Sequence, residues 1–505
     1  MTKVYENVDR IEVDAVNRPE QRSGYAARVK IHPKRTHGTF RTLKWWVMAI
    51  TLTIYYVTPW LRFDRGLHAP DQAVLVDLAN RRFYFFFIEI WPQEFYFVGG
   101  LLVMAGVGLF LLTSTVGRAW CGYTCPQTVW VDLFLVVERF VDGDRNARIK
   151  LDATPWGFDK ITKCLFKHAI WLLIAVSTGG AWIFYFADAP SLAREFVTFN
   201  AAPVAYSTVA VLTGTTYIFA GFMREQVCTY MCPWPRIQGA MLDEHSLTVT
   251  YNDWRGEARG GHKQRRSDPA TAYGDCIDCN LCVAVCPQGI DIRDGQQLEC
   301  ITCALCIDAC NSVMARTGRP LGLISYSTLS DYTAHKAGTR DPDHWPSFIR
   351  PRTFIYIVVF AMIGLGLLVL LAMRDRLVVN VLHDRNPVYV QLSDGTIRNG
   401  YTVKILNKRT EPRSFRLTIE DLPGASMYLA GSSEEARDAL IVAVEADRLK
   451  AIKVYVKADP RTLHERETGF KFVAVDVNGG DTADVARSQA AFERPRKHKK
   501  DEEHD

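Results

Sequence analysis

Most of this 505-residue chain contains no cysteine. All thirteen cysteines lie between Cys121 and Cys310, and the first 120 and the last 195 residues have none. A secreted disulfide framework spreads its cysteines more evenly, so this clustering indicates a metal or redox region. The chain also has little excess charge, a formal net charge of +5. So small a basic excess does not point to nucleic acid as a partner.

Three further absences narrow the chemistry. No Gly-x-Gly-x-x-Gly run follows an expected strand, so the sequence offers no nicotinamide or flavin site. No histidine lies at the centre of an apolar run, which argues against paired axial haem ligands. About 40 polar residues precede the first apolar run, so we expect no cleaved signal peptide. Electrons must then come from an outside donor, in the cytoplasm or in the membrane.

Long apolar runs are present, although the mean hydropathy of −0.04 resembles that of a soluble protein. A helix needs about 20 apolar residues to cross a bilayer. Five stretches meet this requirement: residues 43–61, 95–115, 169–187, 204–223 and 353–373. Five such runs in one chain favour membrane spans over buried helices of a soluble core. The run 83–91 is too short to span, and the sequence leaves open whether it lies at the interface or is re-entrant.

The distribution of lysine and arginine predicts the orientation of these spans. The first 42 residues carry nine, the loop 116–168 carries eight and the segment 224–352 carries fourteen, whereas the other two loops carry four and one. We therefore expect a multi-pass protein of a bacterial inner membrane. Its N-terminus and cysteine-rich segment would face the cytoplasm, and its C-terminal domain would face the periplasm. All cysteines then lie on the side where thiols stay reduced.

Two cysteine runs form the strongest motif in the chain. The first is Cys276-x2-Cys279-x2-Cys282-x3-Cys286-Pro287, and the second is Cys300-x2-Cys303-x2-Cys306-x3-Cys310. This doubled spacing is typical of a bacterial ferredoxin domain with two [4Fe–4S] clusters, in which the fourth cysteine of each run ligates the other cluster. It assigns the first cluster to Cys276, Cys279, Cys282 and Cys310, and the second to Cys300, Cys303, Cys306 and Cys286.

Some alternatives for these runs remain. Zinc sites or a disulfide knot are disfavoured, because they rarely show this spacing. Asn311 stands where a proline usually follows the second run, which alters the turn but removes no ligand. Two clusters in one small domain favour electron transfer over a purely structural role.

A second cysteine motif occurs twice, as Cys121-x3-Cys125-Pro126 and Cys228-x3-Cys232-Pro233. Each copy begins a few residues after the cytoplasmic end of an expected span, and Tyr123 and Tyr230 occupy equivalent places. In a helix the two thiols of a copy lie on one face, about 5–6 Å apart at Cβ. The proline makes a helix boundary or kink after the second thiol. We expect four sulfurs near the membrane surface, in one site or two.

Soft thiolates of this kind select Cu(I) or zinc, or cycle between dithiol and disulfide. The alternative is that these cysteines are small apolar residues packing the span ends, and the repetition of the motif disfavours it. Met231 either adds a thioether ligand or packs, and packing is commoner at a membrane face. Cys164 stands alone before the third span and is expected to be an inert thiol.

After residue 373 the sequence changes to short alternating runs at residues 377–382, 401–406, 415–419, 451–456 and 470–477. Asn386-Pro387, Asp394-Gly395 and Pro423-Gly424 supply turns between them. Short, regularly spaced strands predict an antiparallel, immunoglobulin-like β-sandwich with a docking role. His498 and His504 lie in a charged tail and are expected to be solvated. The basic stretch 255–266 is expected to contact anionic headgroups or an acidic donor.

Together these features predict a multi-domain membrane protein. It combines five transmembrane α-helices, a cytoplasmic two-cluster ferredoxin-like α+β domain and a C-terminal immunoglobulin-like β-sandwich. The expected layout is a cytoplasmic tail 1–42, four spans within 43–223, a cytoplasmic segment 224–352 with the ferredoxin domain at about 268–315, a fifth span 353–373, a periplasmic domain 374–480 and a disordered tail 481–505.

The combination of the doubled Cys-x3-Cys-Pro units, the two ferredoxin runs and a sandwich after the last span resembles the FixG/RdxA/CcoG family. This resemblance covers almost the whole chain. It implies a polyferredoxin accessory protein of the cbb3-type haem–copper oxidase that reduces Cu(II) to Cu(I), a cupric reductase activity. Copper would be its substrate, and oxidase subunits or copper chaperones its partners. The copper-handling or thiol redox site would consist of Cys121, Cys125, Cys228 and Cys232, supplied with single electrons by the eight ferredoxin cysteines.

Two rival functions remain open from the sequence. One is a quinol-linked electron-transfer subunit of an anaerobic respiratory chain, which shares both cysteine motifs; the fifth span and the outer sandwich argue against it. The other is a non-catalytic assembly scaffold, whose clusters only stabilise the fold.

Overall fold

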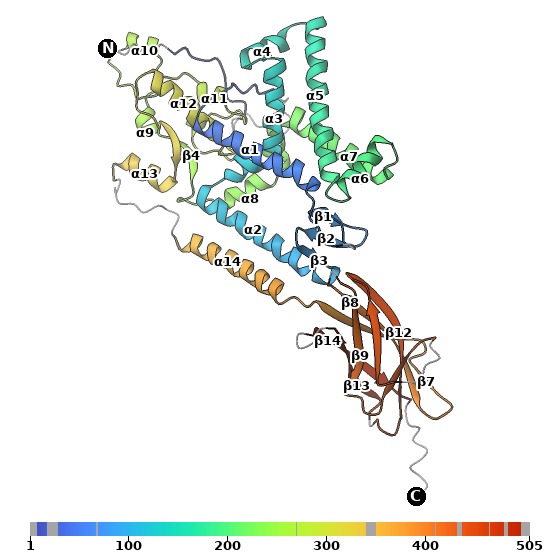
Figure 1. Ribbon diagram of the computed structural model, residues 1–505. Helices are drawn as coiled ribbons and strands as arrows, with labels where there is room; N and C mark the ends of the chain where they lie inside the picture. The colour runs from blue at the N-terminus through green and yellow to red at the C-terminus, as the bar shows by residue number, and fades with distance from the viewer. Residues whose placement is uncertain are drawn as a thin grey trace. The chain divides into compact units, whose positions relative to one another are not determined.

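A computed structural model of the chain describes residues 8–17, 29–66, 69–268, 270–339, 350–409, 411–431, 437–463, 465–478 and 483–495. The chain divides into two compact units (Figure 1). The first consists of residues 1–62 and 72–367 and contains the membrane helices and the ferredoxin domain. The second consists of residues 63–71 and 368–505 and contains the β-sandwich.

Four helices in the described part of the chain are long and apolar enough to cross a membrane. They cover Pro92–Val116, Phe158–Ile183, Pro203–Met223 and Pro351–Ala372. They correspond to the helices α2 (Tyr96–Val116), α5 (Phe158–Ile183), α7 (Pro203–Thr216) with the π-helical segment η5 (Tyr217–Met223), and α14 (Pro351–Ala372). Four of the five predicted spans are therefore present.

The first predicted span, residues 43–61, is not confirmed. Helix α1 (Thr39–Val57) covers most of it, but α1 is not among the four membrane-length apolar helices of the described residues. Arg41 and Lys44 lie in its first two turns and are buried, at 6% and 3% exposure. Both pair with the carboxylate of Asp132, at 3.0 Å and 3.2 Å. These basic side chains thus do not snorkel to an interface; they bind the amphipathic helix α3 (Pro126–Val141).

A second buried carboxylate joins three further segments. Glu138 of α3 is 2% exposed. It accepts hydrogen bonds from Arg148 of α4 (Arg145–Ala153) at 2.7 Å and from Arg224, just after η5, at 2.6 Å. Burial by itself would raise the pKa of Glu138, but the charges of Arg224 and Arg148 outweigh it and lower the pKa to about 2. Buried charges paired in this way hold α3, α4 and η5 in one arrangement.

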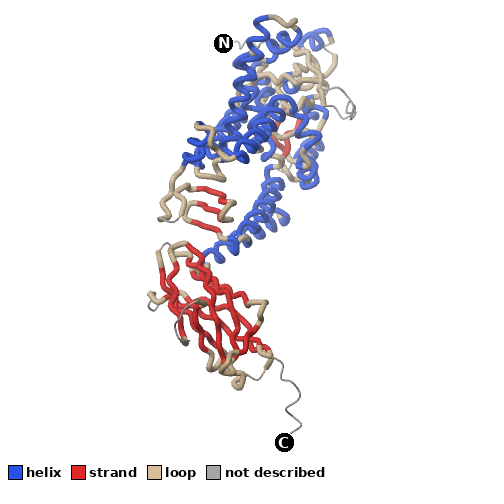
Figure 2. Tube along the Cα trace, turned by 90° about the vertical axis from the view of Figure 1, so that its right-hand side faces the viewer, coloured by secondary structure: helices blue, strands red, loops and turns tan. Residues whose placement is uncertain are grey.

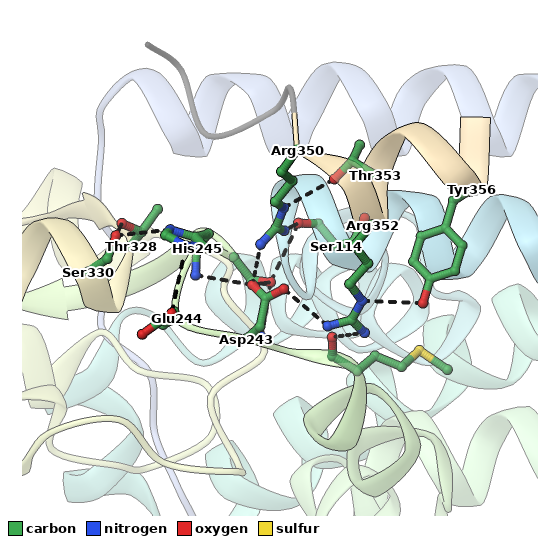
Figure 3. Close-up of polar contacts among 12 residues, drawn as sticks. Ser114, Asp243, Glu244, His245, Thr328, Ser330, Arg350, Arg352, Thr353 and Tyr356 are labelled. Carbon is green, nitrogen blue, oxygen red and sulfur yellow. Dashed lines mark hydrogen bonds and ion pairs between the residues drawn. The ribbon is translucent and has the colours of Figure 1, made fainter. Parts of the chain in front are cut away.

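Helices α2 and α14 lie side by side (Figure 1). Gly100 leaves room for the side chain of Leu367, and the rings of Phe110 and Tyr356 are 6.0 Å apart. The start of α14 is tied down by Asp243, which pairs with both Arg350 and Arg352 (Figure 3).

The same two arginines reach further backbone groups. Arg350 donates to the carbonyl of Ser114 at the end of α2, and Arg352 donates to that of Met241 at 2.8 Å. Burial opposes ionisation of Asp243, but its hydrogen bonds from Arg350 and Ser246 lower its pKa to about 2. One carboxylate thus fixes two membrane helices to the segment that leads into the ferredoxin domain.

The run 83–91, which the sequence left open between an interfacial and a re-entrant position, is not helical. It forms the strands β2 (Arg82–Phe85) and β3 (Ile88–Ile90) of a three-stranded antiparallel sheet with β1 (Val74–Asp77). The turn between β2 and β3 exposes Phe86 and Phe87, the latter by 78%. The aromatic content that suggested an apolar segment is therefore the strand propensity of phenylalanine and tyrosine.

The ferredoxin domain is framed by two antiparallel strands, β4 (Thr248–Tyr251) and β5 (Ile324–Ser327). Between them lie the short helix α11 (Leu281–Ala284) and the longer α12 (Leu305–Arg316). The remaining helices of this unit are α6 (Ala189–Val197), α8 (Trp234–Met241), α9 (Asp253–Gly256), α10 (His262–Ser267) and α13 (Leu329–Ala337). The short 3-10 turns are η2 (Thr58–Trp60), η3 (Pro92–Glu94) and η7 (Ile292–Asp294).

The N-terminal segment, expected as a tail, is attached to this domain. The amide of Ile11 donates to the carbonyl of Cys279 at 3.0 Å, and that of Asn17 donates to Gly289 at 3.1 Å. Further along, Asp308 of α12 accepts from the amide of Arg41 at 2.7 Å, which caps the first turn of α1. The described residues 8–17 and 29–38 thus run along the ferredoxin domain before α1 begins.

The second unit is a β-sandwich of two antiparallel sheets (Figure 2). One sheet has the order β10 (Ser426–Leu429), β12 (Arg448–Ala458), β8 (Ile397–Asn407) and β6 (Leu377–His383), with β7 (Tyr389–Gln391) also paired to β8. The other has the order β11 (Ala439–Val444), β9 (Arg413–Glu420), β13 (Glu467–Asp476) and β14 (Val485–Glu493). The predicted immunoglobulin-like architecture is confirmed, and the sequence analysis missed β7, β10, β11 and β14.

Aromatic side chains fill the space between the two sheets. Tyr401 of β8 is fully buried, and its ring lies 5.4 Å from that of Phe472 in β13. Its hydroxyl donates to the carbonyl of Ala491 at 2.6 Å, which connects β8 to β14. Because β14 completes the sandwich, the domain does not end at residue 480, and residues 485–493 are no disordered tail. His498 and His504 lie outside the described residues.

Replacing the buried Leu417 by alanine should destabilise the sandwich. Leu417 of β9 is fully buried, so Leu417→Ala is expected to cost about 2–5 kcal/mol. Ile441 of the neighbouring strand β11 is 66% exposed, and Ile441→Ala should change stability by about 0.5 kcal/mol or less. Hydrogen exchange of β9 and β13, measured by mass spectrometry, should accelerate in the first variant only. Equal exchange in both variants would contradict the assigned core.

Candidate metal and thiol site

The two predicted ligand loops have the same backbone conformation. In the first, Asp278 and Asn280 have φ values of 49° and 57°. In the second, Thr302 and Ala304 both have φ values of 59°. These left-handed residues stand between the cysteines of each Cys-x2-Cys-x2-Cys run and turn the chain tightly around one point. Each loop then enters a helix, α11 or α12, whose first turn carries the third cysteine.

The last cysteine of each run lies within electrostatic reach of cysteines of the other run. In the first group, a charge on Cys276 or Cys279 would raise the pKa of Cys310. In the second group, a charge on Cys303 or Cys300 would raise the pKa of Cys286. The two groups also adjoin, since a charge on Cys282 would raise the pKa of Cys306. The division into two ligand sets stays a prediction.

The second group lines a cavity that Cys282 of the first group also reaches. Apart from its cysteines and Gln288, the lining is apolar and includes Val249, Ile292 and Ile301. Four of its thiols, those of Cys286, Cys300, Cys303 and Cys306, fit a [4Fe–4S] cluster, which is held by four thiolates. Burial raises the pKa of Cys286 to about 12 and that of Cys300 to about 11. The free thiols would therefore keep their protons, and iron binding must displace them.

The first group has several charged residues close to its ligand loop. Arg293 is bound by Asp291 at 2.7 Å and by Asp278, inside the ligand loop, at 2.8 Å. The carbonyl of Cys276 accepts a hydrogen bond from Arg265 at 2.8 Å. Arg265 belongs to the basic stretch 255–266, which was expected to face a lipid or a donor. At this position the stretch instead supports the ligand loop.

The two Cys-x3-Cys-Pro motifs form π-helical turns, η4 (Trp120–Thr124) and η6 (Val227–Met231). The amides of Cys125 and Cys232 close these turns by donating to residues five positions earlier, at 2.9 Å and 2.7 Å. After the first turn, Pro126 begins α3 as its first residue. The expected helix boundary at the proline is present, but the turn is wider than the α-helix that the spacing suggested. Single π-turns occur frequently at functional sites.

The two motifs bring their four thiols together. They lie within electrostatic reach of one another, since a charge on Cys125 or Cys232 would raise the pKa of Cys121, and a charge on any of these three would raise that of Cys228. Burial raises the pKa of Cys121 to about 11 and that of Cys228 to about 12, so both are neutral thiols at physiological pH. The Cys121 thiol donates to Gln238 of α8 at 2.9 Å. The structure thus supports one cluster of four thiols.

The first motif lies directly on the ligand loop of the second cysteine group. A Cβ atom on Gly122 would stand 2.7 Å from the carbonyl oxygen of Ile301 and 3.1 Å from the Cα atom of Cys303. The Tyr123 hydroxyl donates to the carbonyl of Cys303 at 3.4 Å, and that of Tyr326 donates to Thr302 at 2.7 Å. Only glycine permits this approach of two backbones.

The contact between the two sites excludes water. Cys121, 7% exposed, belongs to an apolar cluster with Val285, Ile301, Cys303 and Leu305, against which Cys306 also packs. Two ligands of the second cysteine group therefore share a core with one thiol of the membrane-face group.

Other residues considered from the sequence are less involved in the thiol site. Met231 and Tyr230 are 50% and 56% exposed, so the copies differ, because the equivalent Tyr123 is buried. Cys164 lies on α5 within electrostatic reach of Tyr217. In the described residues, no three or more His, Cys, Asp or Glu side chains converge as closely as a single metal ion requires.

Sequence reasoning missed Gln238, Gly122 and Arg118, which touch the thiol cluster. The signal for Gly122 was its place inside the motif, where the second copy has Thr229. Gln238 has no local signature, because it reaches Cys121 only through the packing of α8.

Two family models match the chain. A "4Fe-4S dicluster domain" matches residues 223–329, and an "IG-like fold at C-terminal of FixG" matches residues 367–495. With the four membrane-length helices, they define a membrane-bound iron–sulfur protein of electron-transport type.

Similarity to curated relatives extends over nearly the whole chain. It is 59% identical over 498 residues to nitrogen fixation protein FixG of Rhizobium meliloti (strain 1021), covering 94% of this chain and 95% of that protein. Proteins RdxB and RdxA of Cereibacter sphaeroides are 55% and 51% identical, covering 90% and 93% of this chain and 95% and 98% of their own lengths. The chain belongs to the FixG/RdxA/RdxB family, and the resemblance to FixG and RdxA is confirmed.

A solved structure is also similar. The crystal structure of a FixG-related protein from Vibrio parahaemolyticus is 21% identical and covers 24% of this chain and 98% of its own, with a TM-score of 0.20.

Adding a methyl group at Gly122 should disturb the contact between the two sites. Gly122→Ala places a Cβ against Ile301, so we expect a loss of about 1–3 kcal/mol and earlier loss of iron–sulfur absorbance on heating. Gly157→Ala is the control, because no heavy atom lies within 4 Å of its added Cβ. Equal melting of the two variants would show that the backbone contact is unimportant.

Iron analysis should separate the two kinds of cysteine. Two [4Fe–4S] clusters require about eight irons per chain. Cys303→Ser should reduce this to about four, because it removes a ligand of the second cluster. Cys121→Ser should keep all eight. Loss of iron in the Cys121 variant would make that residue a cluster ligand and contradict the assignment.

Proposed function

We propose that this protein is an electron-transfer protein that reduces Cu(II) to Cu(I) for the assembly of a cbb3-type cytochrome oxidase. The observation that carries the proposal is the contact between the first Cys-x3-Cys-Pro turn and the ligand loop of the second cluster. Gly122 and Cys121 lie against Ile301 and Cys303 with no solvent between them. A soft thiol site and a one-electron centre are thereby adjacent.

The clusters, when bound, supply single electrons. The protein's own part is to hold copper where the electron arrives. The thiols of Cys121 and Cys228 are neutral and buried, so binding copper releases their protons. Thiolates are soft ligands and favour Cu(I) over Cu(II). The site therefore stabilises the product of the reduction more than its substrate.

The reaction balances as a one-electron exchange. One reduced cluster loses one electron, and one Cu(II) becomes Cu(I). The thiols keep their oxidation state, since no disulfide forms. Each turnover requires one electron from a low-potential carrier in the cytoplasm or in the membrane, which the first cluster would receive.

Membrane attachment fits this role. The distribution of basic residues supports a cytoplasmic position for both metal sites and a periplasmic position for the β-sandwich, which is free of cysteine. The sandwich would then dock oxidase subunits or a copper chaperone. The relative from Rhizobium meliloti is named a nitrogen fixation protein, and a microaerobic oxidase would support such a process.

Copper reduction can be measured directly on the purified protein. The clusters are reduced with dithionite, excess reductant is removed, and Cu(II) is added anaerobically with a colorimetric Cu(I) chelator. Two clusters that each give one electron should yield about two Cu(I) per chain. The same protein with oxidised clusters provides the baseline for any Cu(I) formed without electrons from the clusters.

The double variant Cys121→Ala, Cys228→Ala should reduce copper at least tenfold more slowly, with its iron content unchanged. Cys164→Ala is the matched control and should behave as wild type, since this thiol lies on α5 outside the site. Equal rates for the double variant and wild type would contradict the copper site. If the clusters could not be reduced at any attainable potential, the assembly scaffold would be favoured. If quinol reduced the clusters rapidly but copper was not reduced, a respiratory electron-transfer subunit would be favoured.

A further inference from the structure

Arg118 is a buried cation that pairs with no carboxylate among the described residues. Its side chain is 3% exposed, and one of its nitrogens donates to the backbone carbonyl of Leu298. Its Nε and Nη2 atoms are buried and have no hydrogen-bond partner among the described residues. No carboxylate in the described part of the chain pairs with it. Burying an unpaired charge is costly, so its retention requires a partner that carries negative charge.

Other buried arginines of this unit are neutralised. Arg224, 6% exposed, is held by Glu138 at 2.6 Å. Arg293 is held by Asp291 and Asp278 at 2.7 Å and 2.8 Å. Within the described residues, Arg118 therefore differs from Arg224 and Arg293, because no carboxylate neutralises its charge.

The groups around Arg118 belong to the second cluster and to the thiol site. Its charge acts on Cys300, a ligand of that cluster, and on Cys121 and Cys228. Leu298, which accepts its hydrogen bond, lies two residues before Cys300. The Glu299 carboxylate acts on Cys300 in the opposite direction and more weakly than Arg118. The partner that Arg118 lacks in the polypeptide is thus the anionic cluster with its thiolates.

Arginines also lie near the first cluster, but each is paired with carboxylates or partly exposed. Arg293 lies between Asp278 and Asp291, at 2.8 Å and 2.7 Å, and Arg10 adds a partly exposed charge 3.4 Å from Asp278. Arg265, which donates to the carbonyl of Cys276 at 2.8 Å, is also partly exposed. Reduction adds one negative charge to a cluster, and a nearby cation stabilises that charge more strongly where water is excluded.

We propose that Arg118 makes the second cluster the one of higher reduction potential, so that an electron entering at the first cluster comes to rest at the second, beside the four thiols. Arg118 is a positioning residue, since it acts through the cluster and not on a substrate. The step moves one electron from the first cluster to the second, with no bond made or broken and no proton transferred. The link between this electron transfer and copper rests on the proposed function. The difference between the reduction potentials of the two clusters does not depend on it.

The test is the distribution of one electron between the two clusters. Protein is reduced by one electron per chain and examined by EPR during a redox titration. The Cys300→Ser variant removes a ligand of the second cluster, so the EPR signal that it loses belongs to that cluster. In wild type most of the signal should come from that cluster.

In Arg118→Gln, the ratio of reduced second to reduced first cluster should fall at least tenfold, equivalent to about 59 mV for one electron. Arg118→Lys keeps the positive charge and should recover most of the wild-type ratio, which a purely structural role would not do. Arg236→Gln removes an exposed arginine on α8 and should leave the ratio unchanged.

The proposal is wrong if Arg118→Gln retains about eight irons and shows the wild-type distribution, or if the wild-type electron rests on the first cluster. It is also wrong if the glutamine and lysine variants shift the ratio equally. If Arg118→Gln loses iron, the proposal is still tested by Arg118→Lys and by which cluster has the higher reduction potential in the wild-type protein. This experiment contains no copper, so a result against the role of Arg118 does not contradict the proposed copper reduction. In turn, a failure to reduce copper does not contradict the proposed difference between the two cluster potentials.

Discussion

The approach of the Gly122 backbone to the loop of Ile301 and Cys303 is the contact on which the rest of the molecule depends. It joins the thiol site, built on the membrane helices, to the ferredoxin domain without an intervening side chain. Several interactions maintain this contact from both sides. Asp308 of the ferredoxin helix α12 caps α1, and Asp243 ties α2 and α14 to the segment before β4.

Much of this scaffold depends on buried ion pairs. Asp132 and Glu138 on α3 carry charges that α1, α4 and the end of η5 neutralise. Such pairs add little net stability, but removing one partner typically costs about 3–5 kcal/mol. They therefore act mainly as constraints on geometry. A helix that slid by one turn would leave a buried charge unpaired, so the thiols and the clusters keep a fixed spacing.

Sequence reasoning succeeded where chemistry is encoded locally. The doubled cysteine spacing predicted the iron–sulfur domain, and the apolar runs predicted four membrane-length helices. The predicted span at α1 is not confirmed, and a hydropathy pattern does not reveal that Arg41 and Lys44 are neutralised by Asp132, about 90 residues away. The sequence left residues 83–91 open, because strand-forming aromatics resemble a short apolar helix. Arg118 and Gln238 owe their importance to tertiary packing alone, which no local pattern records.

The attachment of the N-terminal segment has a consequence for biosynthesis. Asn17 donates to the carbonyl of Gln288, a partner 271 residues later in the chain. At roughly 5–20 residues per second, a ribosome needs on the order of 15–50 seconds to make that partner. During this interval several membrane helices have already been synthesised, and the N-terminal segment has only earlier partners such as Asp152 of α4 to bind. Residues 8–17 can therefore dock onto the ferredoxin domain only after these helices have been made. Cys310, the last ligand predicted for the first cluster, is synthesised after Gln288, so that cluster cannot be complete before the docking partner exists.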